Sequence, residues 1–94
     1  MKVKICGITN FQDALDAINA GANALGFVFY ADSPRYITPL KAREIVEKLP
    51  PFVQTVGLFV NENENFINEI CKESKMQLAQ IIDDHDLIHY GQLN

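Results

Sequence analysis

Short apolar runs alternate with amphipathic segments along the whole chain. Four runs rich in apolar and β-branched residues predict strands at residues 2–6, 24–30, 53–60 and 78–82. The run at 24–30 is apolar at consecutive positions rather than at every second one. This pattern is typical of a strand that is buried on both faces of a parallel sheet.

A segment with helical periodicity follows each of the first three runs. Apolar residues there recur at spacings of three and four, which places them on one face of a helix. The three stripes are Phe11, Ala14, Leu15 and Ile18, then Ala42, Ile45, Val46 and Leu49, then Phe66, Ile67, Ile70 and Cys71. Each stripe predicts a helix that lies on a sheet.

Polar caps and helix breakers bound the three predicted helices. The expected N-caps are Thr9 or Asn10, Thr38 and Asn61, and the expected stops are Gly21 and the pair Pro50–Pro51. Gln12 follows Thr9, and Glu64 follows Asn61, at the spacing of a capping box. Pro39 comes directly after Thr38, where its missing N–H leaves no hydrogen bond unmade.

The chain ends in a fourth segment of helical character. Residues 83–90 predict the start of a helix, in which Asp83, Asp84 and Asp86 are acids favoured by the helix dipole rather than catalytic groups. The element order is therefore βαβαβαβ with a helical start, which predicts an α/β fold with a parallel sheet and right-handed crossovers. A barrel of eight such units takes about 250 residues, so four units correspond to half of one. The pattern alone leaves a half barrel and a small flavodoxin-like open sheet as alternatives.

Composition bounds the class of protein. The 94 residues suffice for one domain, and 48% apolar with 21% charged residues is ordinary for a globular chain. A net charge of -4 argues against a nucleic-acid-binding surface. No apolar stretch approaches the length of a membrane span and no secretory leader opens the chain, so we expect a cytoplasmic protein without membrane contact.

Cysteine and histidine do not form a metal-binding pattern. Cys6 and Cys71 are far apart in different kinds of element, and we expect two reduced, partly buried thiols. His85 and His89 stand four residues apart without a third ligand, which indicates a solvated pair and no metal site.

Three junctions between a strand and the following helix have specific wording. They read Lys-Ile-Cys-Gly-Ile-Thr at 4–9, Gly-Phe-Val-Phe-Tyr at 26–30 with Ser-Pro-Arg-Tyr-Ile at 33–37, and Val-Gly-Leu-Phe-Val-Asn at 56–61. In this order and spacing, the chain from residue 3 to about 61 resembles the phosphoribosylanthranilate isomerases of tryptophan biosynthesis. The resemblance implies a (β/α)8 TIM barrel, of which residues 1–94 supply the first four βα units as its N-terminal half.

The resemblance also implies a reaction and a set of site residues. The family catalyses an Amadori rearrangement of N-(5-phosphoribosyl)anthranilate to 1-(2-carboxyphenylamino)-1-deoxyribulose 5-phosphate, which needs proton transfers and no cofactor. The resemblance makes Cys6 the general base and Arg35 the ligand of the anthranilate carboxylate. It also makes Gly7 and Gln80 substrate-binding residues. A thiolate at the end of a strand and a guanidinium that pairs with a carboxylate both suit this chemistry. Phe27, Phe29 and Tyr30 are either an aromatic wall for the anthranilate ring or plain strand packing.

The chain departs from the family at its fourth strand. The family often has Gln-Leu-His-Gly where this chain has Gln80-Ile81-Ile82-Asp83, so a polar residue expected near Ile82 is absent. By resemblance, the general acid and the phosphate-binding loops belong to later strands. We therefore expect negligible isomerase activity from the isolated chain.

A half barrel has open edges. The first and fourth strands lack one neighbour each, and the inward side chains of all four strands are expected to face solvent. Such a surface favours self-association or pairing with a C-terminal half. Two other hypotheses stay open: a related barrel such as indole-glycerol-phosphate synthase, against which the cysteine at position 6 argues, and a non-catalytic half-barrel module that acts by self-association.

Overall fold

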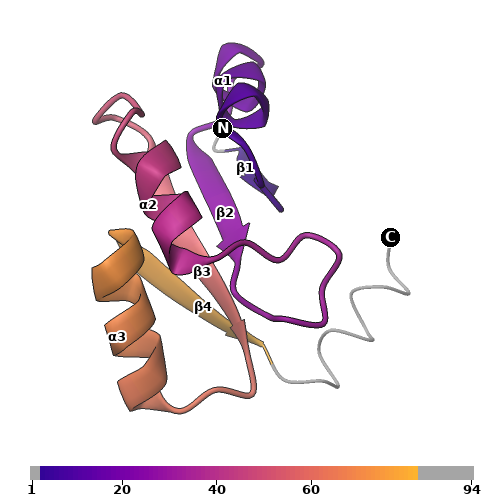
Figure 1. The fold of residues 1–94 in the computed structure, drawn as a ribbon. Coiled ribbons are helices and arrows are strands. Elements are labelled where there is room, and N and C mark those ends of the chain that lie inside the picture. The colour runs from indigo at the N-terminus through magenta and orange to yellow at the C-terminus, as the bar shows by residue number, and fades with distance from the viewer. Residues whose placement is uncertain (1–2, 83–94) are drawn as a thin grey trace.

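The structure, a computed structural model, describes residues 3–82. The predicted helix at 83–90, with Asp83, Asp84, Asp86, His85 and His89, lies outside the described residues. The elements are β1 (Lys4–Cys6), α1 (Phe11–Asn19), β2 (Ala24–Val28), α2 (Pro39–Val46), β3 (Gln54–Val60), α3 (Glu64–Ser74) and β4 (Leu78–Ile82). The alternation predicted from the sequence is confirmed (Figure 1).

The four strands form one parallel sheet in chain order, β1-β2-β3-β4. One row of the sheet runs from Cys6 through Gly26 and Val56 to Leu78, with each residue paired to the next. Since every strand lies beside its neighbour in sequence, the order never reverses over residues 3–82 as it does in a doubly wound sheet.

All three helices cover the same face of this sheet. The main core cluster contains the odd-numbered residues Leu25, Phe27 and Phe29 of the β2 segment, packed with small and aliphatic residues from the helices. The helix residues in the cluster are Ala14, Ala17, Ala42, Ile45 and Ile67. A sequential parallel sheet with helices on one face only is a segment of a (β/α)8 barrel, which excludes the open-sheet alternative.

The helix starts follow side-chain capping. Asn10, rather than Thr9, caps α1, because its Oδ1 accepts from the backbone N–H of Asp13 at 2.8 Å. Thr38 caps α2 as predicted, and its Oγ1 accepts from the N–H of Lys41 at 3.3 Å. Gly21, with φ +104, follows α1 in a conformation that glycine adopts without strain.

The predicted cap of the third helix is wrong by two residues. Asn61 has a left-handed backbone conformation with φ 54, and the chain turns there before the helix begins. Asn63 is the N-cap of α3, and its Oδ1 accepts from the N–H of Phe66 at 2.8 Å. The second helix also ends earlier than Pro50–Pro51 suggests, since α2 stops at Val46 with Glu47 as its C-cap.

The two outer strands are exposed, as expected for half a barrel. Ile5 on β1 is 41% exposed and Ile81 on β4 is 62% exposed, both at odd positions of the helix-covered face. The expectation that inward side chains of all four strands face solvent is wrong for the central strands. Val28, Val56 and Val60 are buried, because inward side chains of a curved, tilted sheet converge on one another.

Candidate functional site at the carboxyl ends of the strands

Cys6 is the last residue of β1 and its side chain is exposed. Its neighbour in the sheet is Gly26, and a Cβ atom added to that glycine would lie 2.8 Å from Cys6 Sγ. The thiol therefore occupies space that only a glycine at position 26 leaves open. The site residues predicted from the sequence do not include Gly26, although a glycine inside a buried strand is a signal of close approach.

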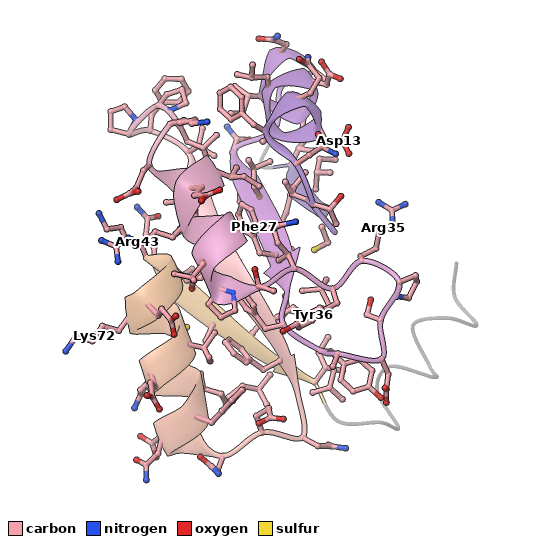
Figure 2. The ribbon with its side chains drawn as sticks, in the orientation of Figure 1. Asp13, Phe27, Arg35, Tyr36, Arg43 and Lys72 are labelled. Atoms are coloured by element: carbon pink, nitrogen blue, oxygen red, sulfur yellow. The ribbon has the colours of Figure 1, made fainter. Side chains whose placement is uncertain are left out.

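Arg35 contacts Gly7, the residue that follows Cys6. Its Nη1 donates to the carbonyl oxygen of Gly7 at 3.4 Å, and its Cγ would lie 3.3 Å from a Cβ added to Gly7. Gly7 has φ +89, a backbone conformation that residues with a side chain rarely adopt. The loop after β2 thus carries Arg35 to the end of β1, and in Figure 2 the side chain extends outward from that loop.

Cys6, Gly7 and Arg35 line one open cavity. It has a volume of about 350 Å³ and continues between β1 and α1, where Ala17 and Ala20 contribute to its wall. The predicted convergence of the thiol and the guanidinium on the carboxyl end of the sheet is therefore present in the fold. The carboxylates of Asp13 and Asp16 line the α1 side of the same cavity, while at the strand end the Arg35 guanidinium can pair with a carboxylate of a substrate.

Gln80 lies on β4, apart from these three residues. Its Oε1 accepts a hydrogen bond from Lys4 Nζ at 2.5 Å, across 76 residues of sequence. The site residues predicted from the sequence do not include Lys4, because no local pattern indicates that β1 and β4 face each other across the sheet.

The aromatic residues of the second strand divide between the core and a pocket separate from the cavity at Cys6. Phe27 is fully buried and Phe29 is 6% exposed, and the ring centroid of Phe29 lies 5.5 Å from that of Phe59. Both belong to the core under the helices, with Phe27 in the region of α2 in Figure 2, so strand packing is the correct interpretation for them. Tyr30, half-buried, instead lines a separate pocket of about 250 Å³ beneath the β2–α2 loop, together with Asp32 and Leu58.

The two thiols have different surroundings. Cys6 and Cys71 are both free, as predicted, but Cys6 is exposed whereas Cys71 is partly buried on α3. Burial raises the pKa of the Cys71 thiol. Over residues 3–82, no cluster of three His, Cys, Asp or Glu side chains is arranged to hold a metal ion, and none of the helices is long and apolar enough to cross a membrane.

Comparison with known proteins decides the family. The profile of N-(5'-phosphoribosyl)anthranilate (PRA) isomerase matches residues 3–89. The chain belongs to the phosphoribosylanthranilate isomerase family. It is 60% identical over 86 residues to the N-(5'-phosphoribosyl)anthranilate isomerase of a Sulfurovum species, a match that covers 92% of the chain and 44% of the relative. The corresponding protein of a Nitratiruptor species is 65% identical over 81 residues, covering 86% of the chain and 41% of the relative.

Solved isomerases share the fold. Phosphoribosylanthranilate isomerase from Thermotoga maritima superposes with a TM-score of 0.86 at 43% identity, over 99% of this chain and 45% of that one. An isomerase in complex with reduced 1-(o-carboxyphenylamino)-1-deoxyribulose 5-phosphate has the same TM-score and identity, over 99% of this chain and 48% of that one. The chain thus spans less than half the length of these relatives.

Proposed function

We propose that the barrel to which this half belongs isomerises N-(5-phosphoribosyl)anthranilate to 1-(2-carboxyphenylamino)-1-deoxyribulose 5-phosphate. The observation that carries the proposal is the junction of Cys6, Gly7 and Arg35 at the carboxyl end of β1, in a chain of the isomerase family. A solved relative binds the reduced product in the same fold, which supports this choice of ligand. The cysteine also argues against the synthase hypothesis, whose chemistry uses lysine and glutamate.

In this proposal Cys6 is the general base. After the ribose ring opens to the imine, the thiolate removes the proton from C2 of the sugar, and the resulting enolamine tautomerises to the ketose. Arg35 binds the anthranilate carboxylate through its guanidinium, and Gly7 lets the backbone approach the ligand closely. Gln80 supplies a hydrogen bond to the substrate from β4. The acid that assists ring opening comes from the other half of the barrel, and no cofactor is needed.

The test uses a complete barrel in which residues 3–82 replace the matching segment of the Nitratiruptor relative. We expect turnover of the substrate by this chimera, and a loss of about 10²–10⁴-fold in kcat for Cys6→Ser, the range for removal of a general base. Arg35→Met raises KM. Cys71→Ser is the matched control and keeps the parent rate, because Cys71 lies on α3 away from the site.

The proposal has two clear failures. A folded chimera without turnover would refute it, and so would a Cys6→Ser variant with the parent kcat. The isolated chain is expected to have negligible activity, and turnover near that of the chimera would show that one half barrel is sufficient.

The open edges define the partner that we propose. Within residues 3–82, β1 and β4 each lack a neighbour on one side, and both carry exposed aliphatic side chains. A C-terminal half barrel, or a second copy of this chain in its absence, covers these edges. One solved relative consists of monomers generated from the dimeric T. maritima enzyme, at 39% identity, a TM-score of 0.83 and coverage of 98% of this chain and 49% of that one. The two free thiols suit the reducing cytoplasm, where we propose that the protein works.

A further inference from the structure

A side-chain hydrogen bond joins the two edge strands. Lys4 Nζ on β1 donates to Gln80 Oε1 on β4 at 2.5 Å. Two strands, β2 and β3, lie between them in the sheet, so the contact crosses the concave face rather than following the hydrogen-bond ladder. A single lysine side chain can join the two edge strands only because the sheet is strongly curved.

The register shows that the strands are also tilted. Lys4 is in the row of Ala24 and Gln54, whereas Gln80 is in the row of Leu58 and Val28, four residues further along the central strands. Strands in a barrel are staggered so that rows of paired residues climb along the axis. This stagger brings Lys4 and Gln80 together although they belong to different rows.

The contact fixes which way the Gln80 amide faces. A lysine ammonium group has donors only, so the atom of Gln80 that meets it must be the oxygen. The Nε2 group, with its two hydrogens, is then turned away from Lys4. Gln80 is half-buried, and Lys4 stands two residues before Cys6 on the same face of β1. The pair therefore spans the floor of the concave face, from two residues before the row of Cys6 to two residues beyond it.

We propose that Lys4 is a positioning residue, which holds the Gln80 amide so that Nε2 donates to an oxygen atom of the substrate. This inference rests on the proposed function, in which Gln80 contacts the substrate. Carboxylate, phosphate and sugar oxygens are all acceptors, so a donor held in place is the useful orientation, whereas a flipped amide would present its oxygen to an anion. Lys4 acts through Gln80 and does not itself touch the reacting atoms.

The first experiment tests the orientation in the chain itself, without any catalysis. We expect the side-chain NH2 of Gln80, assigned by its loss in Gln80→Met, to show a rigid heteronuclear NOE in the unmodified chain and in the Lys41→Met control. Lys41 is an exposed lysine of α2, away from this floor. In Lys4→Met the same NH2 becomes mobile. Equal mobility in all three chains overturns the inference, whatever the outcome for isomerase activity.

The second experiment separates a donor role from a purely structural contact, in the chimeric barrel. Gln80→Glu keeps an acceptor for Lys4 and removes the Nε2 donors. We expect Lys4→Met and Gln80→Glu each to raise KM about tenfold, the size of one lost hydrogen bond to a charged group, with kcat nearly unchanged. The Lys4→Met, Gln80→Met double variant is no worse than Gln80→Met alone, because Lys4 acts only through Gln80. Lys4→Arg retains a donor and recovers most of the affinity.

The outcomes distinguish this inference from the proposed function. An unchanged KM in Gln80→Glu shows that the pair is only structural and overturns the donor role. A chimera without turnover refutes the proposed function, while the NMR comparison still decides whether Lys4 orients Gln80. Thermal unfolding of each variant, with a melting temperature near that of the parent, establishes that the effects do not come from a loss of fold.

Discussion

At the scale of single residues, two glycines shape the site as much as its reactive side chains. Gly26 leaves room for the sulfur of Cys6, and Gly7 turns the backbone so that Arg35 packs against it. Cys6 and Gly26 are neighbours in the sheet although twenty residues of sequence separate them. Because the Cys6 thiol fills the space beside Gly26, a larger residue at position 26 is expected to clash with the sulfur.

Gly26→Ala should therefore destabilise the chain and displace the thiol. The added Cβ would lie 2.8 Å from Cys6 Sγ and 3.1 Å from Cys6 Cα. We expect a loss of about 1–3 kcal/mol in the free energy of unfolding, typical of overpacking, measured by urea denaturation. Since the sulfur is the nearest atom, the double variant Cys6→Ala with Gly26→Ala should recover part of the loss. A Gly26→Ala chain as stable as its parent would contradict this geometry.

The two thiols should react at different rates. Cys6 is exposed, whereas Cys71 is partly buried. Burial raises the pKa of the Cys71 thiol, which lowers the fraction of Cys71 that is the reactive thiolate at neutral pH. Iodoacetamide should label Cys6 several-fold faster, as measured by mass spectrometry of the two peptides. The difference should persist in Cys71→Ser and Cys6→Ser single variants, and equal rates would show that Cys6 is not open to solvent.

At the scale of helices and strands, the caps decide where each helix begins. Both Asn61 and Asn63 precede α3, and the sequence favours Asn61 because Glu64 stands at capping-box spacing. The left-handed turn at Asn61 delays the helix, so the amide oxygen of Asn63 takes the capping role instead. The two asparagines therefore have separate roles that substitution can distinguish.

Asn63→Ala should cost about 1 kcal/mol in the free energy of unfolding, the usual value for an N-cap. It removes the 2.8 Å hydrogen bond from the N–H of Phe66. Asn61→Gly is the matched control, expected to leave stability nearly unchanged, since glycine adopts positive φ without strain. If Asn61→Gly were the more harmful change in chemical denaturation, the cap would be at Asn61 after all.

Glu47 links the ends of α2 and α3, and its contribution to stability is expected to depend on pH. Hydrogen bonds from Lys75 first, and then from Arg43, lower the pKa of its carboxyl group. Because this pKa is lowered in the folded state, the ionised Glu47 stabilises the fold above the ordinary glutamate pKa. This stabilisation is lost as the pH falls through the folded-state pKa. The stability difference between the parent and Glu47→Gln, small at neutral pH because the group is exposed, should shrink as the pH falls below the ordinary glutamate pKa of about 4.3, and should vanish once the pH is below the lowered folded-state pKa. A difference that grew on acidification, in denaturation curves across pH, would contradict the sign.

At the scale of the whole molecule, the unpaired edges of β1 and β4 are expected to determine how the isolated chain associates. Ile81 on β4 and Leu40 on α2 are both 62% exposed, but of the two only Ile81 lies on a strand with an unpaired edge among residues 3–82. An unpaired edge with aliphatic side chains favours association with another edge. The matched exposure of these two residues allows edge pairing to be separated from general hydrophobic association.

Ile81→Lys should reduce self-association of the isolated chain, because a lysine on an edge strand opposes pairing. Leu40→Lys should leave the association state unchanged. Light scattering over a range of concentrations measures both. A parent chain that stays monomeric at high concentration, or an equal effect of the two lysines, would show that the edges do not drive association.

Much of the fold, and part of the site, follows from local sequence patterns. Apolar runs and helical stripes locate all seven described elements, and the strand at 78–82 matches β4 to the residue. Cys6, Gly7 and Arg35 follow from local wording at strand ends. The roles of Gly26 and Lys4 do not, because they depend on sheet register, curvature and stagger. These are properties of the assembled strands that no short segment contains.

The chain-order sheet has a consequence for synthesis. Each strand pairs with the one translated just before it, so the hydrogen-bond ladder can grow from the N-terminus as the ribosome releases each βα unit. The lysine–glutamine bridge joins the first strand to the fourth, across 76 residues, and can form only after the fourth has emerged. Folding in this order leaves two edges with unpaired backbone groups at every stage, one on the first strand and one on the newest strand, and a complete barrel removes both when its last strand pairs with its first.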